Sequence, residues 1–303
     1  MRALVSGSTG FSGGFLCAAL RALGSEVLAV SQRVEAPGVR RTDLTSSAAW
    51  ASVLRDVQPD HVFHLSGVTH TPELSQFALH NTAAAAALLD AALGLEKAPS
   101  SVLLVGSAAE YGIVPETALP VVETFPASPR MPYGATKHAQ TRLGLEAARR
   151  GLRVVIARPS NIIGPGMPVS SALGTFARQL REIELGRRAP TLSVGDLGTS
   201  RDFVDVRDAA QAFLALGMHP SCSGVVNVSA GQHVTLRAIL DQLIAAFGLQ
   251  VTVEVDPARL RAVEVQKFSA SSQRWHELLG PQALIPLADT VRAIVQHERA
   301  ALS

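Results

Sequence analysis

The sequence predicts an α/β protein: a doubly wound parallel sheet of the Rossmann type, with a smaller mixed α/β lobe in the C-terminal half. Three observations predict it. Short buried strands alternate with helical segments over the first 160 residues, the first strand enters a helix through a glycine-rich turn, and the regular alternation ends after Arg158. We therefore expect residues 1–160 to form the sheet domain, rejoined by about 201–225, and residues 161–200 and 226–303 to form the lobe.

The composition is that of a compact protein with a sizeable core. Of 303 residues, 47% are hydrophobic and 17% are charged, and the net charge is +2. This charge gives no reason to expect nucleic-acid binding, and no apolar run reaches the roughly 18 residues that a membrane helix requires. Cys17 and Cys222 are isolated, which predicts neither a disulfide framework nor a zinc site. Because the first residues do not read as a signal peptide, we expect a cytoplasmic location.

The glycine-rich turn follows the first predicted strand, Arg2–Ser6, and leads into a helix. A strand, a glycine turn and a helix together provide a tight bend, close approach of backbone to a pyrophosphate, and helix N–H groups that bind anions. The first domain is therefore predicted to bind NAD or NADP, although a turn with spare glycines is an alternative interpretation. The residues expected at the cofactor are Gly7, Gly10, Phe11, Ser12 and Gly13.

The end of the second strand, Glu26–Val30, bears on the choice of cofactor. An acidic residue at this point would hold the ribose 2′-hydroxyl of NAD, but the chain continues Ser-Gln-Arg33. Since Arg33 can pair with a 2′-phosphate, NADP is favoured and NAD is the alternative. An arginine that merely faces solvent would leave the choice open. Asp43 and Leu44, after the third strand, are expected at the adenine edge.

Small residues end the fourth strand, which we place over residues 60–67. Backbone must lie close to a ligand at this point, so we expect the cofactor to contact Leu65, Ser66 and Gly67.

Three further polar residues lie on or near the fourth strand. His61 and His64 alternate onto opposite faces, and no carboxylate or cysteine completes a metal site, so both are interpreted as structural and no metal is expected. Asn81 opens an alanine-rich helix that we expect to reach Leu93. It is either a helix cap or a residue of the cofactor site that positions the neighbouring strands.

The fifth strand, Ser101–Val105, delivers Ser107 to the carboxyl end of the sheet, where ligands of open α/β sheets bind. Prolines then lead into a helix that begins near Pro132, so Tyr133 and Lys137 share one face. A cation one turn away favours the phenolate and lowers the pKa of the tyrosine, which would make the two an acid–base pair. Tyr-x-x-x-Lys by itself is a weak signal, because a solvated helix face also produces it.

The spacing of apolar residues predicts how the following elements pack. Ala139, Leu143 and Ala147 recur every four residues, which predicts a stripe that docks on the sheet. In the second half, a strand is expected at Val225–Ser229 and a helix begins after Thr235, its expected N-cap.

Arginines are concentrated in two stretches of the second half. A predicted helix, Leu173–Gly186, carries Arg178 and Arg181, and the polar stretch 194–208 contains Arg201. Guanidinium groups bind phosphates through paired hydrogen bonds, so these side chains can clamp a diphosphate.

Four motifs in order resemble those of the extended short-chain dehydrogenase/reductases that act on nucleotide-diphosphate sugars, and the likeness covers nearly the full chain. Within this family the chain is most like the GDP-4-dehydro-6-deoxy-D-mannose reductases. The motifs are the glycine turn Gly7–Gly13, the set Ser107, Tyr133 and Lys137, the passage Arg158–Gly166, and the passage Arg201–Asp208.

The resemblance implies a role for each matching residue. Tyr133 would protonate the sugar 4-oxygen as hydride arrives from the nicotinamide. Lys137 would lower the pKa of the tyrosine and bind the nicotinamide ribose, and Ser107 would hold the carbonyl oxygen. Relatives often dimerise through the helix that carries the tyrosine, so a homodimer is expected. The residues that match sugar and diphosphate positions are Asn161, Arg201, Arg261 and Glu264.

One absence separates this chain from the related 4,6-dehydratases. Those enzymes resemble it but place an acid directly after the Ser or Thr, to remove the C5 proton and expel the C6 hydroxyl. Here the positions are Ala108 and Ala109, which cannot transfer a proton. Glu110 comes one residue later and, on an extended strand exit, should point the other way. Dehydration is therefore not expected.

The leading hypothesis is an NADPH-dependent reductase of GDP-4-dehydro-6-deoxy-D-mannose that forms a GDP-6-deoxyhexose, most simply GDP-D-rhamnose. The alternatives are a 4-epimerase with tightly bound NAD and a reductase of a TDP-linked ketosugar. A cofactor-sensing binding protein on the same fold is a further alternative, but such proteins tend to lose the tyrosine or the lysine, and both are present.

Overall fold

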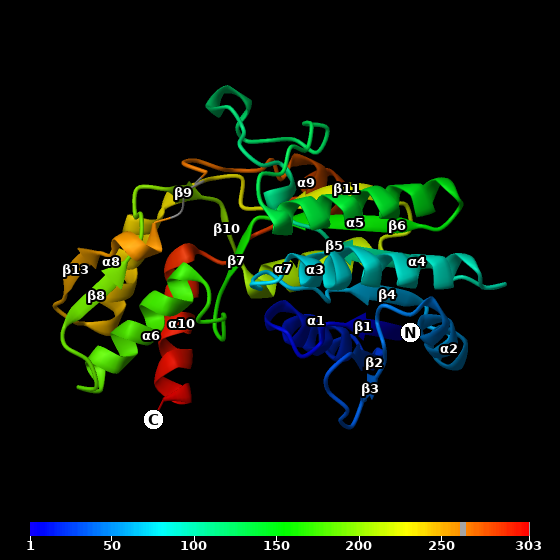
Figure 1. The fold of residues 1–303 in the computed structure, drawn as a ribbon, viewed down its shortest axis with the longest axis horizontal. Helices are drawn as coiled ribbons and strands as arrows, with labels where there is room; N and C mark the ends of the chain where they lie inside the picture. Colours follow the sequence, from blue (N-terminus) through cyan, green and yellow to red (C-terminus); the bar gives the residue numbers. More distant parts are fainter. Residues whose placement is uncertain (261–264, 303) are drawn as a thin grey trace.

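Seven parallel strands form the central sheet, in the order β11-β6-β5-β4-β1-β2-β3 (Figure 1). The structure is a computed structural model that describes residues 1–260 and 265–302. Its sheet confirms the doubly wound α/β fold that the alternation of strands and helices predicts. The strands are β1 (Arg2–Ser6), β2 (Glu26–Ser31), β3 (Val39–Arg41), β4 (His61–His64), β5 (Ser101–Val105), β6 (Val154–Pro159) and β11 (Gly224–Val228).

The strand order reverses between β1 and β4, because the chain adds β2 and β3 on one side and then crosses to the other. Ser6 and His64 are paired in register at the ends of these two strands. In open α/β sheets a crevice forms outside the carboxyl ends of the strands at such a switch point, and ligands bind there. The fold therefore places the glycine turn, which follows Ser6, at the binding edge of the sheet.

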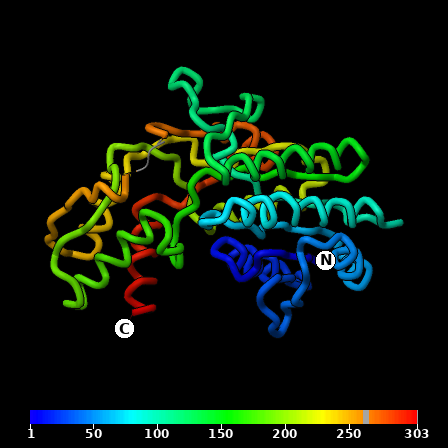
Figure 2. Tube along the Cα trace, in the orientation of Figure 1, coloured from blue at the N-terminus to red at the C-terminus, as the bar shows by residue number. Residues whose placement is uncertain are grey.

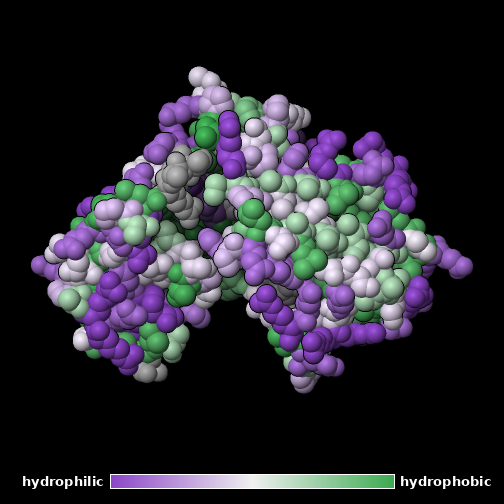
Figure 3. Space-filling view, in the orientation of Figure 1, coloured by the Kyte–Doolittle hydropathy of each residue, from purple (hydrophilic) through white to green (hydrophobic). Residues whose placement is uncertain are grey.

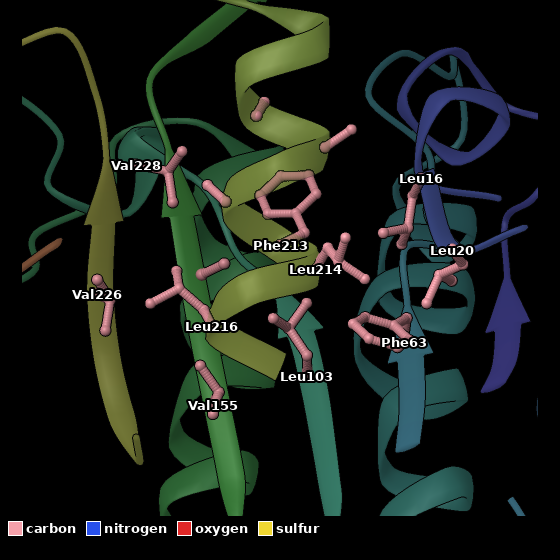
Figure 4. Packing of buried hydrophobic residues seen from close by; sticks show 14 of the residues in the cluster. Leu16, Leu20, Phe63, Leu103, Val155, Phe213, Leu214, Leu216, Val226 and Val228 are labelled. Carbon is pink, nitrogen blue, oxygen red and sulfur yellow. The ribbon is translucent and has the colours of Figure 1, made fainter. Parts of the chain in front are cut away.

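Helices cover both faces of the sheet and bury one apolar cluster on each. One face carries α1 (Phe11–Ala22), α7 (Val206–Met218) and α9 (Gln273–Leu279), and Figure 4 shows Phe213, Leu214 and Leu216 of α7 packed on the strands. Each such side chain contributes about 1.5–3 kcal/mol when fully buried. The helices on the other face are α2 (Ser47–Val57), α4 (Ala84–Leu93) and α5 (Pro132–Arg149).

The lobe lies beside the carboxyl edge of the sheet (Figure 2). It has its own apolar cluster. The lobe is assembled from distant parts of the chain. Thr235 is the N-cap of α8, as predicted, and its Oγ1 accepts a hydrogen bond from Ala238 N at 3.1 Å. Short strand pairs connect the lobe to the sheet domain. The lobe contains α6 (Ala172–Glu184), α8 (Leu236–Phe247), α10 (Leu287–Ala301) and the parallel pair β8 (Thr191–Val194) and β13 (Thr252–Val255); the connecting strands are β7 (Asn161–Ile163), β9 (Ser200–Arg201), β10 (Phe203–Asp205) and β12 (Val234–Thr235).

The strand predicted at Val225–Ser229 is β11, and it pairs with β6 in the main sheet, with Val226 opposite Ala157. A boundary at residue 225 would therefore cut a strand of the sheet. Trp275 of α9 is also part of the cluster under the sheet. Among the described residues, no helix combines the length and the apolarity that crossing a bilayer requires.

The prediction that Asn81 opens a helix is wrong. The helical segment begins seven residues earlier with α3 (Leu74–Phe77), continues through a π-helical turn (Ala78–Ala83) and runs on as α4. Asn81 lies in the π-helical turn and is fully buried. Such wide turns reorient side chains inside a helix and are frequent at functional sites.

The predicted packing stripe of α5 is partly wrong, because Ala147 is buried but Leu143 is not. Leu143 is 36% exposed, whereas the buried face carries small and polar residues: Gly134, Lys137, Gln140, Thr141, Gly144 and Ala147. The helix lies so close to the sheet that a Cβ on Gly144 would approach Leu104 Cδ1 at 2.8 Å. Small residues permit this approach, and it brings Lys137 into the interior.

Candidate active site

The turn after β1 is shaped by backbone crowding that glycine alone accepts. Gly7 has φ +77°, and a Cβ there would lie 2.7 Å from Ser66 N. A Cβ on Gly13 would overlap the carbonyl oxygen of Gly7, which also accepts the Gly10 N–H at 3.0 Å. The turn therefore leads directly into α1, with Phe11 and Ser12 in its first turn.

The N-terminus of α1 lacks a side-chain cap, because Gly10 is its N-cap residue. Its first N–H groups therefore face the turn with the positive end of the helix dipole. Ser8 Oγ is buried there and has no hydrogen-bond partner among the described residues. A cradle of this kind, which any Cβ would fill, fits the diphosphate of a dinucleotide.

Asn81 connects the loop after β4 to α5. Its Oδ1 accepts from Val68 N at 2.8 Å, and its Nδ2 donates to Val68 O at 3.0 Å and to Thr136 Oγ1 at 3.1 Å. A Cβ on Gly67 would lie 2.7 Å from Asn81 Oδ1 and 3.4 Å from Lys137 Nζ. Asn81 thus positions the segment that includes Leu65, Ser66 and Gly67, and it brings Lys137 beside that backbone.

The histidines of β4 make hydrogen bonds to serines of neighbouring strands. His64 Nδ1 is 2.8 Å from Ser6 Oγ, and His61 Nδ1 is 2.8 Å from Ser101 Oγ. His64 is fully buried, which lowers its pKa to about 3, so its ring is neutral.

The residues predicted at the adenosine end lie in different surroundings. Arg33 is exposed just after β2, where its backbone N–H bonds to Ser31 Oγ. Asp43 is exposed, and hydrogen bonds from the hydroxyl and N–H of Thr45 lower its pKa. Leu44 is a core residue, 4% exposed, whose carbonyl accepts from Trp50. Its side chain is part of the apolar cluster on the α2 and α4 face, so a contact to an adenine would have to come from its backbone.

Ser107 and Tyr133 meet at the carboxyl end of β5. Ser107 caps a short 3₁₀ turn, Ala108–Glu110, with Oγ accepting from Ala109 N at 3.1 Å. A hydrogen bond from Ser107 lowers the pKa of Tyr133, but burial raises it more strongly and the nearby Glu110 raises it further. The net effect is a raised pKa, so the phenol holds its proton at neutral pH.

Lys137 is buried, and its ammonium group is directed at the end of β5. Nζ donates to Val105 O at 2.8 Å and to Gln140 Oε1 at 3.0 Å. Burial lowers its pKa to about 8 against the opposing effect of Glu110. The pKa of Tyr133 is raised overall because the desolvation of the phenol dominates, so the lowering predicted from Lys137 does not appear in the net shift.

Glu110 is a site residue whose role the sequence pattern does not reveal. It lies on the 3₁₀ turn rather than on an extended strand exit, and it folds back beneath Ser107. Its carboxylate is fully buried, accepts from Ser107 N at 2.9 Å and from Arg158 Nη2 at 2.7 Å, and lies 3.7 Å from His138 Nδ1. These hydrogen bonds and charges lower its pKa despite the burial, so it stays ionised.

The residues predicted to hold the substrate are only partly brought together. Asn161 is exposed on β7 and donates from N and Nδ2 to the carbonyl of Asp202, at 3.0 and 3.1 Å. Arg201 precedes Asp202 in the chain, lies on β9, and donates a hydrogen bond from Nη1 to Ser200 O. Arg178 is ion-paired with Glu298 of α10 at 3.1 Å. Arg261 and Glu264 lie outside the described residues.

Asp202 is a second residue that sequence reasoning misses. Its carboxylate is fully buried and accepts three backbone N–H bonds, from Ala230 at 2.9 Å, Gly231 at 3.1 Å and Ala270 at 3.2 Å. Burial nevertheless raises its pKa to about 7. The hydrogen bonds of Asp202 connect three segments of the chain next to Asn161. Asp202 lies in the charged motif Arg201–Asp208, and nothing in that sequence indicates that its side chain is buried.

A parallel sheet with a glycine cradle at its switch point, followed by a serine and a Tyr-x-x-x-Lys helix at the same edge, defines an NAD(P)-dependent enzyme of the extended short-chain dehydrogenase/reductase class. The chain belongs to the NAD dependent epimerase/dehydratase family, whose model matches residues 3–229.

Individual proteins are similar over nearly the whole chain. The GDP-6-deoxy-D-mannose reductase of Pseudomonas aeruginosa is 33% identical, over 97% of this chain and 96% of its own. The dTDP-6-deoxy-L-talose 4-dehydrogenase (NAD(P)(+)) of Kitasatospora kifunensis is 31% identical over 85% and 82%. The structure of RMD from Pseudomonas aeruginosa complexed with NADPH superposes with a TM-score of 0.86 at 31% identity, covering 99% of this chain and 98% of that one. These comparisons confirm the predicted family.

Proposed function

We propose that the protein is an NADPH-dependent reductase that converts the 4-keto group of GDP-4-dehydro-6-deoxy-D-mannose to a hydroxyl, forming GDP-6-deoxy-D-mannose, which is GDP-D-rhamnose. The observation that carries the proposal is the 33% identity to a GDP-6-deoxy-D-mannose reductase over 97% of the chain. The polar residues at the carboxyl end of β5 and the start of α5 supply the chemistry that such a reaction needs.

The proposed proton donor is Tyr133. Its raised pKa keeps the phenol protonated at neutral pH, so it can donate to the sugar 4-oxygen while the carbon accepts a hydride. Ser107, hydrogen-bonded to the phenol, is positioned to hold the same oxygen. NADPH, when bound, would supply the hydride and become NADP⁺. Carbon and oxygen of the carbonyl thus receive one hydride and one proton, which gives the alcohol.

Lys137 is proposed to stabilise the negative charge that Tyr133 acquires on losing its proton. With a pKa of about 8 it is largely cationic at neutral pH. The backbone of Gly67 lies beside the ammonium group, since a Cβ on Gly67 would be 3.4 Å from Nζ. We propose that Lys137 also contacts the nicotinamide ribose, as in the family that the chain resembles.

NADPH is proposed as the preferred cofactor. The two residues directly after β2 are Gln32 and Arg33, so no carboxylate is present there to repel a 2′-phosphate, and Arg33 is exposed. The similar RMD structure contains NADPH. The diphosphate would lie on the cradle of Gly7, Gly10 and Gly13.

Dehydration is disfavoured by the residues after Ser107. Ala108 and Ala109 carry no acid, and Glu110 is ionised, buried and bonded to Arg158. Its carboxylate is therefore occupied by hydrogen bonds to Ser107 N and Arg158, which stabilise the turn after β5. A 4-epimerase with bound NAD and a reductase of a dTDP-sugar remain the alternatives; the latter is favoured by the similar dTDP-6-deoxy-L-talose 4-dehydrogenase.

We also propose that the sheet domain binds the cofactor. The lobe and the β7–β10 region are proposed to hold the nucleotide sugar through Asn161 and Arg201.

We further propose that the protein is a cytoplasmic homodimer. Exposed apolar side chains support a self-association surface along the helices on one face: Leu74 is 70%, Leu79 39% and Leu143 36% exposed. Figure 3 shows apolar patches over α4 and α5. Sedimentation velocity with Leu79→Glu tests this, because a dimer should become a monomer.

The experiment that tests the function follows reduced-nicotinamide absorbance with purified protein and GDP-4-dehydro-6-deoxy-D-mannose. Oxidation of NADPH in preference to NADH, with one GDP-6-deoxyhexose formed per NADPH, is expected, and NMR of the product should show the rhamno configuration. Turnover only with the dTDP-linked ketosugar would support the dTDP-sugar alternative. Interconversion of C4 epimers without net cofactor consumption would support the epimerase instead.

A further inference from the structure

A cleft of about 400 Å³ lies between the start of α1 and the C-terminal helix α10. Figure 1 shows α10 facing the start of α1, and Figure 3 shows that the surface is hollowed between the lobe and the sheet domain at this point. Side chains and backbone from both parts of the chain line it: Gly10, Phe11 and Phe15 from the glycine turn and α1, and Gly166, Pro168 and His297 from the lobe side.

The His297 side chain belongs to the cleft rather than to the core of the lobe. His297 is exposed, whereas Val295 and Glu298 on the same helix are buried. Its ring lies over the backbone at Gly166, where a Cβ would be 3.5 Å from both Cε1 and Nε2. Gly166 has φ +78°, a conformation that favours glycine, and the ring is close enough to be in van der Waals contact with a Cβ at this position.

Apart from backbone N–H groups, the described lining of the cleft contains one side chain that could donate a hydrogen bond to an anion and carry a positive charge, His297. Its other described lining residues are glycine, phenylalanine, proline and threonine, so His297 is the one ionisable side chain among the described residues that line it. The lining includes Gly10 and Phe11, which are the N-cap residue and the first residue of α1, and this helix end has no side-chain cap. A hydrogen bond from an imidazole N–H to a phosphate oxygen has a charged acceptor, which makes it stronger than a bond between neutral groups.

We infer that His297 is a further cofactor-binding residue, which donates a hydrogen bond across the cleft to the diphosphate of the dinucleotide on the glycine turn. The inference rests on the proposed function, since it takes the dinucleotide as the ligand of that turn. It has a mechanical consequence. The cofactor would contact the sheet domain and the lobe at once, so its binding would hold α10 against the start of α1.

The experiment measures binding of two ligands by the complete protein without substrate. NADPH contains the diphosphate, and adenosine 2′-phosphate contains the 2′-phosphate but no diphosphate. Titrations compare wild type, His297→Ala, His297→Gln and the control Gln296→Ala, an exposed neighbour on α10 that is not a lining residue of the cleft. We expect His297→Ala to raise the Kd for NADPH about tenfold, with a smaller rise for His297→Gln, which keeps an N–H donor. The Kd for adenosine 2′-phosphate should stay within about twofold.

The outcomes separate this inference from the proposed function. If wild type binds NADPH and His297→Ala binds it equally well, the inference fails and the function stands. Equal weakening of both ligands would also overturn it, because the effect would not depend on the diphosphate. If wild type binds neither ligand, the proposed use of NADPH fails, and the inference fails with it.

Discussion

Arg158 Nη2 lies 2.7 Å from Glu110 Oε2, and the two side chains are 4% and 0% exposed. The other carboxylate oxygen of Glu110 accepts the backbone N–H of Ser107 at 2.9 Å. The guanidinium group of Arg158 also stacks on the Tyr111 ring, 4.5 Å from its centroid. A buried ion pair therefore fixes the turn that presents Ser107 to Tyr133, and it connects this turn to β6.

Breaking this pair should destabilise the protein far more than breaking an exposed one. Arg158→Met leaves the Glu110 carboxylate buried without its partner, which costs about 3–5 kcal/mol. Arg237→Met removes an exposed pair to Asp241, 2.9 Å apart on α8, and should cost less than about 1 kcal/mol. Urea unfolding at pH 7 measures both. Equal decreases in the free energy of unfolding for the two variants would show that the buried ion pair stabilises the protein no more than the exposed one.

The main sheet could be predicted because its signals are local. Residues 3–5 and 102–105 are continuous apolar runs that fit strands buried on both faces, and the strands Arg2–Ser6 and Ser101–Val105 are found with the predicted bounds. The start of α5 at Pro132 could also be predicted, because proline fits the first turn of a helix. The membership of Val225–Ser229 in the sheet was not, because that depends on a pairing with Val154–Pro159, about 70 residues away.

The site was predictable in its residue types and not in its electrostatics. Spacing places Tyr133 and Lys137 on one face of a helix, but it does not show that Lys137 is drawn to Val105 O and Gln140. Burial then decides both pKa values. Glu110 and Asp202 look like solvated charges in the sequence, since nothing local shows that tertiary packing buries them.

The chain has two tyrosines, which provides a matched test of the proposed proton donor. Tyr133→Phe removes the phenol hydroxyl beside Ser107 and should lower kcat by about 10²–10⁴-fold, with the Kd for NADPH nearly unchanged. Tyr111→Phe removes a buried hydroxyl that donates to Asn227 Oδ1 at 2.8 Å and should cost about 1 kcal/mol of stability instead. Stopped-flow kinetics and unfolding curves distinguish the two effects. A Tyr133→Phe enzyme with wild-type kcat would exclude the phenol as the donor.

The buried ammonium group of Lys137 should make stability depend on pH. Burial lowers its pKa from 10.5 to about 8 in the folded protein. Between these values the unfolded chain holds one more proton, so the free energy of unfolding rises with pH through this window, by about 3 kcal/mol in total. Lys137→Met has no such group. Comparing urea unfolding of the two proteins at pH 7.5 and pH 10 isolates this contribution, because the other titrations cancel. Parallel pH profiles would contradict the assignment.

The same titration predicts the alkaline limb of the activity profile. As pH rises through about 8, Lys137 loses the charge proposed to stabilise the tyrosinate, so kcat should decline. The measurement is kcat at saturating substrate from pH 6.5 to 9.5, with protein integrity checked at each pH. A kcat that stays constant to pH 9.5 would show that the charge of Lys137 is not needed.

Arg33 should determine the preference for NADPH over NADH. Arg33→Ser removes the cation proposed to meet the 2′-phosphate, and a hydrogen bond to a charged group contributes about 1.5–3 kcal/mol, so the Kd for NADPH should rise about ten- to hundredfold. The Kd for NADH should stay the same. Arg40→Ser is the control, since its side chain is paired with Asp56 at 2.8 Å. Fluorescence titration with both nucleotides decides the matter; a parallel change for NADPH and NADH would place Arg33 outside the 2′-phosphate site.

Gly13 and Gly14 are adjacent in α1, and the structure predicts opposite responses to the same substitution. A Cβ on Gly13 would overlap the Gly7 carbonyl oxygen and lie 2.8 Å from Ser8 Cα, so Gly13→Ala must displace the glycine turn. It should destabilise the protein by about 1–3 kcal/mol and abolish NADPH binding. At Gly14 the nearest atom, Ser8 O, is 3.9 Å away, so Gly14→Ala introduces no crowding.

In a helix, alanine is favoured over glycine by about 0.5–1 kcal/mol, because glycine loses more backbone freedom on folding. Gly14→Ala should therefore raise the free energy of unfolding and leave the Kd for NADPH near the wild-type value. Thermal unfolding and NADPH titration of both variants give the comparison. If Gly13→Ala binds NADPH as well as Gly14→Ala does, the close packing of the turn against α1 is not what forms the cradle, because one added methyl group would have moved the backbone without effect on the ligand.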